Sequence, residues 1–107
     1  MKRANVQTLR PREVEDTDAE LVRRVSEGDL SPLGTLYDRH HQGVRQFIVR
    51  ATAGGADAED IAHETFLTLG KIAGRYDGRA SARPLLLGIA AQLVRQHRRG
   101  VARFFQG

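Results

Sequence analysis

The chain has 107 residues, 40% of them hydrophobic and 28% charged, a composition typical of one soluble domain with a modest core. It contains no cysteine, which excludes disulfides and thiolate chemistry, and its longest apolar run, at Leu85-Leu86-Leu87, is too short to cross a bilayer. The formal net charge of +4 favours a polyanionic partner, and we expect a cytoplasmic protein without membrane insertion.

The first predicted helix follows an expected flexible leader. Residues 1–16 lack an apolar period and contain a proline, so no stable element is predicted there. In the next segment, "TDAE", Thr17 stands at an N-cap position and Glu20 three residues later, the pattern of a capping box. Apolar residues then recur at helical spacing up to Gly28, where we expect this helix to stop.

The second predicted helix is long and amphipathic. Ser31 supplies a hydroxyl that can cap it, and Pro32 suits its first position. We expect it to end at Gly54-Gly55. Steps of three and four residues mark its inner face: Leu33, Leu36, Tyr37, His40, Val44, Phe47, Ile48 and Ala51.

Two further helices are predicted on either side of a turn at residues 77–81, "DGRAS". The third helix begins at Asp57, whose side chain can cap it, and its inner face contains Ile61, Ala62, Thr65, Phe66, Leu69, Ile72, Ala73 and Tyr76. Ser81 can cap the fourth, whose inner face contains Leu85, Leu86, Ile89, Ala90, Leu93 and Val94.

No segment alternates with a period of two, so the predicted fold is all-α, a compact bundle of about four helices. The expected organisation is a flexible leader at 1–16, a helical domain at 17–100, and a tail or the start of a linker at 101–107.

Residue patterns for catalysis or metal binding are not found in the sequence. "HETFL" lacks the second histidine of a zinc-protease helix, and the adjacent His40 and His41 point about 100° apart on a helix, so they cannot chelate together. We expect His40 in the core. The serines at helix boundaries are explained by capping, and no glycine-rich phosphate loop is present. We therefore expect no metal, no cofactor and no enzymatic activity.

The charges are segregated along the chain. Residues 57–66 contain four acids and no Lys or Arg, more than helix capping requires, which indicates a basic protein partner. From Arg75 to Arg103 there are seven arginines and one acid, Asp77, and arginine and glutamine side chains at this density suit nucleic acid. A solvated surface is the alternative explanation of both runs.

Three stretches stand in order along the chain: "ELVRRVSEGDLSPLGTLYDRH", "DAEDIAHETFLTL" and "RYDGRASARPLLLGIAAQLVRQHRR". Together they resemble conserved region 2 of bacterial sigma factors of the extracytoplasmic-function (ECF) group, from about Asp18 to Gly100. The second stretch is similar to the most recognisable motif of that group, Asp-Ala-Glu-Asp followed by Gln-Glu-x-Phe.

The resemblance implies two partners, each with its own residues. The acidic third helix would dock on the β′ clamp helices of core RNA polymerase through Asp57, Glu59, Asp60, His63 and Glu64, with Phe66 at the margin. The loop and fourth helix would bind the −10 element of promoter DNA, with a flipped non-template base in the loop, through Arg79, Ala80, Ser81, Arg83, Gln92, Arg95, Gln96, Arg98 and Arg99. An anti-sigma factor is a further partner known in this family.

The sequence also departs from the family pattern. His63 stands where relatives have glutamine, Gly70 and Leu85 where tryptophan is common, and Ala82 where phenylalanine is frequent. The loop therefore has less aromatic character for stacking bases. The helix-turn-helix module that reads the −35 element in this family is not found in the sequence, and two explanations stay open: a domain of a longer protein, or a truncated factor.

The function implied is promoter −10 recognition and opening by a polymerase-docked domain. The alternative is a sigma-like interaction module that binds polymerase or an anti-sigma factor without opening promoters.

Overall fold

The fold was described from a computed structural model that covers residues 16–53, 57–78 and 80–106, with residues 101–106 described by their backbone alone. Within these ranges the chain is helical and contains no strand, as predicted. The elements are α2 (Asp18–Ser26), α3 (Pro32–Ala51), α4 (Ala58–Ile72), a 3₁₀ turn η2 (Ala73–Arg75) and α5 (Arg83–Gln106). The predicted leader, apart from its last residue, lies outside the described residues, as do Gly54 and Gly55.

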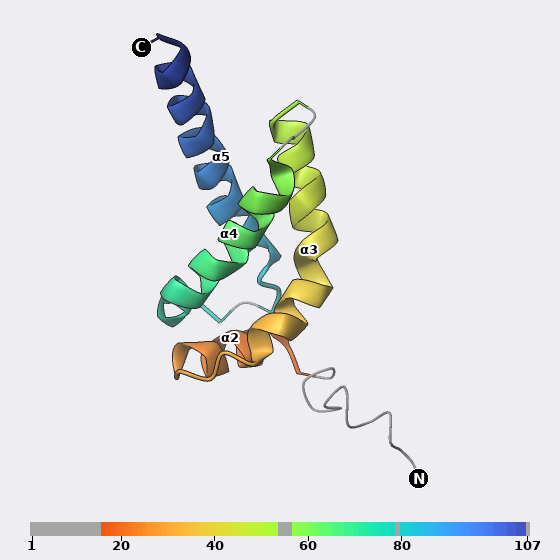
Figure 1. The fold of residues 1–107 in the computed structure, drawn as a ribbon. Coiled ribbons are helices and arrows are strands. Elements are labelled where there is room, and N and C mark those ends of the chain that lie inside the picture. The colour runs from red at the N-terminus through yellow and green to blue at the C-terminus, as the bar shows by residue number, and fades with distance from the viewer. Residues whose placement is uncertain (1–15, 54–56, 79, 107) are drawn as a thin grey trace.

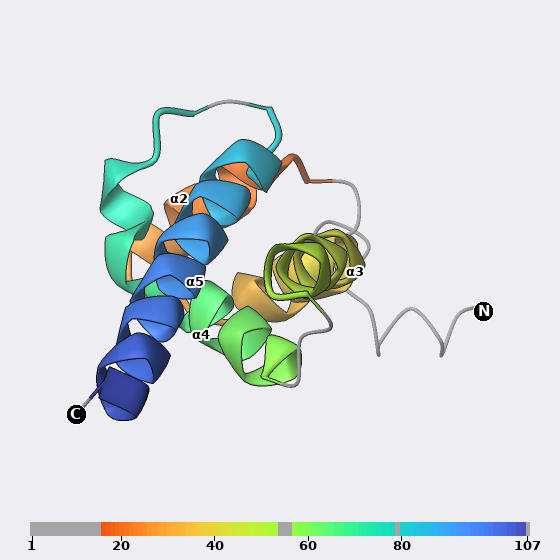
Figure 2. The same cartoon turned by 90° about the horizontal axis from the view of Figure 1, so that it is seen from above.

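The helices α3, α4 and α5 pack against one another, and in Figure 1 α4 is drawn between the other two. The short α2 crosses at one end and packs on α3 and η2. Seen from above, the connection from η2 to α5 runs along the edge of the bundle (Figure 2). This arrangement exposes one face of α4 and one face of α5.

The start of α2 has the capping box that the sequence predicts. The Glu20 amide donates to Thr17 Oγ1 at 3.2 Å, and the Thr17 amide donates to Glu20 Oε1 at 3.0 Å. The helix ends before Gly28, whose φ of +101° is a left-handed conformation that glycine adopts without strain.

Loss of this cap is expected to lower stability without changing the fold. Thr17→Ala removes the acceptor for the Glu20 amide, so the free energy of unfolding should fall by about 1 kcal/mol. Urea unfolding followed by circular dichroism measures the change. Ser26→Ala, at an exposed position in the last turn of the same helix, is the control and should cost clearly less. An equal loss in both variants would contradict the capping role.

Two of the predicted caps are wrong. Ser31 precedes α3, but both its amide and its hydroxyl donate to Asp29 Oδ1, at 3.1 and 2.9 Å, so its oxygen does not cap the helix. Asp57 does precede α4, but its carboxylate makes no capping bond and lies 3.2 Å from His97 Nε2 of α5. The predicted cap at Ser81 is confirmed, because its Oγ accepts the Arg83 amide at 3.1 Å.

The predicted inner faces meet in one core. The largest fully buried side chains come from α2, α3, α4 and α5: Leu21, Val22, Pro32, Leu36, Val44, Ile48, Thr65, Leu69 and Leu86. The Thr65 hydroxyl is satisfied there by donating to the Ile61 carbonyl at 2.8 Å. At Gly70, Leu33 Cδ1 would lie 3.3 Å from a Cβ, so a larger side chain at this position would require Leu33 to move.

The helix ends differ from the predicted ones in two places. The helix α3 stops at Ala51, and the left-handed conformation after it falls on Ala53, with φ of +53°, before the predicted glycines. The helix α5 continues to Gln106, past its expected end near residue 100.

Candidate functional site

The outward face of α4 combines acid with an apolar side chain. Asp60, His63 and Glu64 are exposed, and Leu67, three residues after Glu64, is 61% exposed although it is a large hydrophobic residue. Spacings of three and four residues place all of them on one stripe of the helix. The sequence analysis missed Leu67, although its position outside the predicted inner face was a usable signal.

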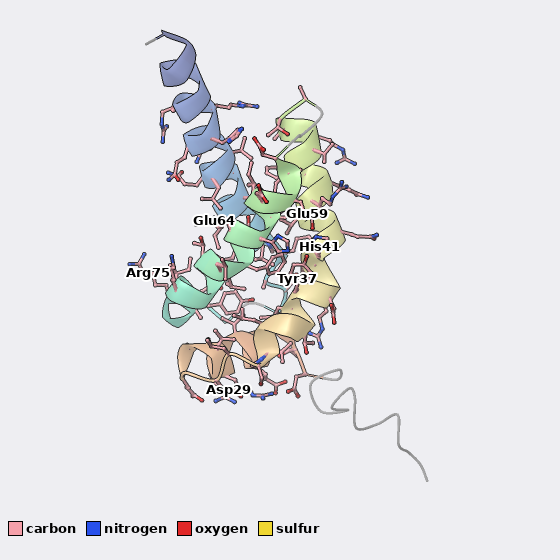
Figure 3. All side chains as sticks on the ribbon, viewed as in Figure 1. Asp29, Tyr37, His41, Glu59, Glu64 and Arg75 are labelled. Atoms are coloured by element: carbon pink, nitrogen blue, oxygen red, sulfur yellow. The ribbon has the colours of Figure 1, made fainter. Side chains whose placement is uncertain are left out.

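Glu59 belongs to a different part of the surface than the other acids. It lies toward α3, where His41 Nε2 is 3.0 Å from Oε2 and Arg45 Nε is 3.0 Å from Oε1 (Figure 3). The hydrogen bond from His41, with that from Arg45, holds the pKa of Glu59 below its usual range although partial burial opposes this. Its charge is therefore matched within the domain, and the acid available to a partner is concentrated at Asp60 and Glu64.

Aromatic rings join α3 to α4 beside this ion pair. Tyr37 stacks on His41, with ring centroids 4.4 Å apart, and on His63 at 5.8 Å. Its hydroxyl lies 3.3 Å from His63 Nε2, and its edge meets Phe66 at 5.0 Å. Phe66 is only 6% exposed, so it packs beneath the exposed face of α4. The sequence analysis had expected it at the margin of the polymerase contact.

A groove separates α4 from α5. Asp57 and His97 form an ion pair across it, and both sides contribute to its lining: Asp57, Asp60, Ile61, Glu64, Leu93, Gln96 and His97. Glu64 lies on the α5 side of α4 in Figure 3, as this lining requires. Gln96 therefore lines the groove beside the acids of α4, and its spacing of four residues from Gln92 and three from Arg99 keeps it on their side of α5.

Apart from Gln96, the predicted DNA-binding residues of α5 lie in three places: an exposed strip, a position at the end of α3, and the start of α5. Gln92, Arg95 and Arg99 share an exposed strip, at spacings of three and four residues, and Arg95 donates to Gln92 Oε1 at 2.6 Å. Arg98 instead donates to the Ala51 carbonyl at the end of α3, where a cation complements the helix dipole.

Arg83 lies at the other end of α5, over α3. Its Nη1 would be 2.7 Å from a Cβ at Gly43, so the absence of a side chain at Gly43 allows the guanidinium to approach. Ala80 and Ser81 are exposed in the preceding loop. Arg79, the remaining predicted contact, lies outside the described residues.

A pocket opens between the end of η2 and the start of α5. One wall comes from the segment 75–77 and the other from residues flanking Ala82, and together they are Arg75, Tyr76, Asp77, Ser81, Pro84 and Leu85. Its lining combines apolar surface and the Tyr76 ring with one basic and one acidic side chain, Arg75 and Asp77, and an aromatic ring beside apolar surface suits the stacking of a planar base. The sequence predicted the turn here but not the pocket, because its walls belong to two elements.

A buried carboxylate holds the start of α5. Asp18 Oδ2 accepts the Ala82 amide at 2.7 Å and lies 2.6 Å from His40 Nε2, while Oδ1 accepts from Arg39 at 2.9 Å. Burial raises the pKa of Asp18, but these three hydrogen bonds outweigh it and hold the pKa below its usual range. His40 is buried, as predicted, and its Nδ1 has no partner.

The comparison with known proteins decides the family. The model of the sigma-70 region 2 family matches residues 36–104. The chain belongs to this family. The match includes α4, α5 and the loop between them, so the surfaces described above lie within the shared domain.

Two curated relatives are sigma factors. ECF RNA polymerase sigma factor BldN of Streptomyces coelicolor is 38% identical over 80 residues, which cover 73% of this chain and 30% of BldN. RNA polymerase sigma factor CarQ of Myxococcus xanthus is 34% identical over 83 residues, which cover 75% of this chain and 48% of CarQ. The resemblance to an ECF sigma factor region 2 is thus confirmed, and the chain spans less than half the length of these relatives. No solved structure matches it.

None of the described helices is long and apolar enough to span a membrane. Across 16–53, 57–78 and the described side chains of α5, no three His, Asp or Glu residues cluster as metal ligands would.

Proposed function

We propose that this sigma-factor domain docks on core RNA polymerase through α4 and recognises the −10 element of a promoter through α5 and the loop before it. It supplies sequence specificity and no catalysis of its own. The observation that carries the proposal is the separation of charge on neighbouring helices, with exposed acids on α4 and an exposed arginine strip on α5.

The surface of α4 suits a basic protein surface. Asp60 and Glu64 lie one turn apart, and the exposed Leu67 supplies an apolar contact beside them. Glu59 is already paired with His41 and Arg45, so it contributes by fixing α4 against α3. In the ECF pattern the β′ clamp helices bind at these positions, which supports the assignment of this partner.

The strip on α5 and the adjacent pocket suit single-stranded DNA. Arg95 and Arg99 can contact phosphates, and Gln92 lies beside them with an amide that can read a base edge. A base extruded from the duplex costs a few kcal/mol of stacking, which the pocket beside Tyr76 can offset.

Fluorescence anisotropy with labelled non-template −10 oligonucleotides tests this function. With core polymerase present, the domain should bind a −10 sequence at least about tenfold more tightly than a scrambled oligonucleotide of equal composition. A matched control omits the domain, and a second omits the polymerase. Equal affinity for both oligonucleotides, weakened by salt, would contradict recognition of the −10 sequence. It would mean that basic side chains bind the DNA phosphates without sequence preference.

One observation favours the alternative, a polymerase-binding module that does not open promoters. Ala82, where relatives carry an aromatic ring, is fully buried and bonded to Asp18, and the described loop residues between Tyr76 and Ala82 include no aromatic side chain. Tight binding to polymerase without any oligonucleotide binding would identify this alternative.

A further inference from the structure

The first turn of α2 lies beside both ends of the loop that precedes α5. Asp18 accepts the Ala82 amide at 2.7 Å across 64 residues of sequence. The following residues of α2, Ala19 and Glu20, line a second hollow together with Tyr76 and Gly78 at the start of the loop.

The surroundings of Asp18 hold its carboxylate in one position. The carboxylate is buried, with 6% of the side chain exposed, and each oxygen has a hydrogen-bond partner on another element. It also stands at the N-terminal ends of α2 and α5, where a negative charge is favourable. Two partners, Arg39 and His40, come from α3, so three elements fix the position of this group.

The hydrogen bond between Asp18 and the Ala82 amide fixes the position of one wall of the pocket. Ser81 precedes Ala82, and Pro84 and Leu85 follow it, and all three line the pocket opposite Arg75, Tyr76 and Asp77. Since Ala82 is fully buried and its carbonyl accepts the Leu86 amide at 2.9 Å, this point joins the loop rigidly to α5.

We infer that Asp18 is a positioning residue for base recognition, which sets the separation of the two pocket walls by holding the Ala82 amide, although it touches no DNA. This inference rests on the proposed function and names a determinant of its specificity. An amide in place of the carboxylate turns its NH₂ group either toward Arg39 or toward Ala82 and His40, and it removes the negative charge in both cases. The Ala82 bond therefore weakens, because a neutral oxygen is a poorer acceptor than a carboxylate.

The test compares Asp18→Asn with Thr17→Ala, which weakens the same helix turn through its cap but leaves the Ala82 bond intact. With core polymerase, Asp18→Asn should lower the preference for the −10 oligonucleotide over the scrambled one by about tenfold, the effect of one poorly held base. Affinity for polymerase itself should change less than about twofold, because α4 is unchanged. Thr17→Ala should keep the preference.

Amide hydrogen exchange of the free domain provides a second measurement that does not depend on DNA. Exchange at Ala82 should accelerate at least about tenfold in Asp18→Asn relative to the core amides of α4, since its acceptor is weakened. Unchanged exchange at Ala82, or an equal loss of preference in Thr17→Ala, would overturn the positioning role.

Two outcomes separate this inference from the proposed function. If the wild-type domain prefers the −10 oligonucleotide and Asp18→Asn does so equally, the inference fails and the function stands. If the wild-type domain shows no preference, the function fails and the role in recognition fails with it. Should Asp18→Asn not fold, Asp18→Glu, which keeps the charge but displaces it by one methylene, should fold and lower the preference at least about threefold.

Discussion

Glu64→Lys is expected to weaken binding of the domain to core RNA polymerase by about a hundredfold, because it places a like charge against a basic partner surface. The free energy of unfolding should change by less than about 0.5 kcal/mol, since Glu64 is exposed and lies beyond the first turn of α4. Anisotropy of a labelled domain titrated with core polymerase measures the affinity, and urea unfolding measures the stability.

Glu27→Lys is the matched control for this prediction. It makes the same change in net charge at an exposed site directly after α2, where Glu27 pairs with Arg23 on the surface at 3.0 Å. Its affinity for polymerase should stay within about twofold of the wild type. Equal loss in both variants would mean that net charge, and not the α4 face, determines binding.

Asp18→Ala is expected to destabilise the domain by about 3 kcal/mol or more, because it leaves the Arg39 and His40 side chains and the Ala82 amide without their shared acceptor. That is a large part of the stability of a domain this small. Urea unfolding followed by circular dichroism measures the loss. Asp38→Ala, at an exposed aspartate of α3, should cost less than about 0.5 kcal/mol, and a similar cost in both variants would contradict the role of the buried carboxylate.

The same group gives a pH dependence of defined sign. Because the pKa of Asp18 is lower in the folded chain than its ordinary value of 3.8, the unfolded state binds the proton more readily. Its contribution to stability is fully present above 3.8 and is lost as the pH falls through the folded pKa. The difference in unfolding free energy between wild type and Asp18→Ala should therefore shrink below that value, and a constant difference would contradict it.

The helices could be predicted from the sequence because their signals are local. The capping box at Thr17, the glycine stop at Gly28 and the steps of three and four residues all act within a few residues of chain. The caps at Ser31 and Asp57 failed for a physical reason: a short polar side chain can bond either to its own helix or to another group. The Asp57 carboxylate instead lies against His97 of α5, forty positions later, and no local sequence pattern predicts that contact.

The candidate site could be predicted only in part, because some of its contacts join different helices. Asp60 and Glu64 stand four residues apart in the sequence, so their shared face could be predicted. The pairing of Glu59 with His41 and Arg45 depends on how α3 packs against α4, so the sequence could not show that this acid is matched within the domain. The position of Gln96 in the groove likewise depends on how α5 packs against α4.

The placement of α4 beside α5 has a geometric consequence for the two proposed partners. One helix supplies walls to both surfaces, since Leu93 and His97 line the groove with α4 while Gln92 and Arg95 are exposed. A helix with its side chains is about 10 Å across, and no flexible segment intervenes between these positions of α5. The domain would therefore act as a spacer of fixed thickness, which holds the polymerase and the opened strand at one separation.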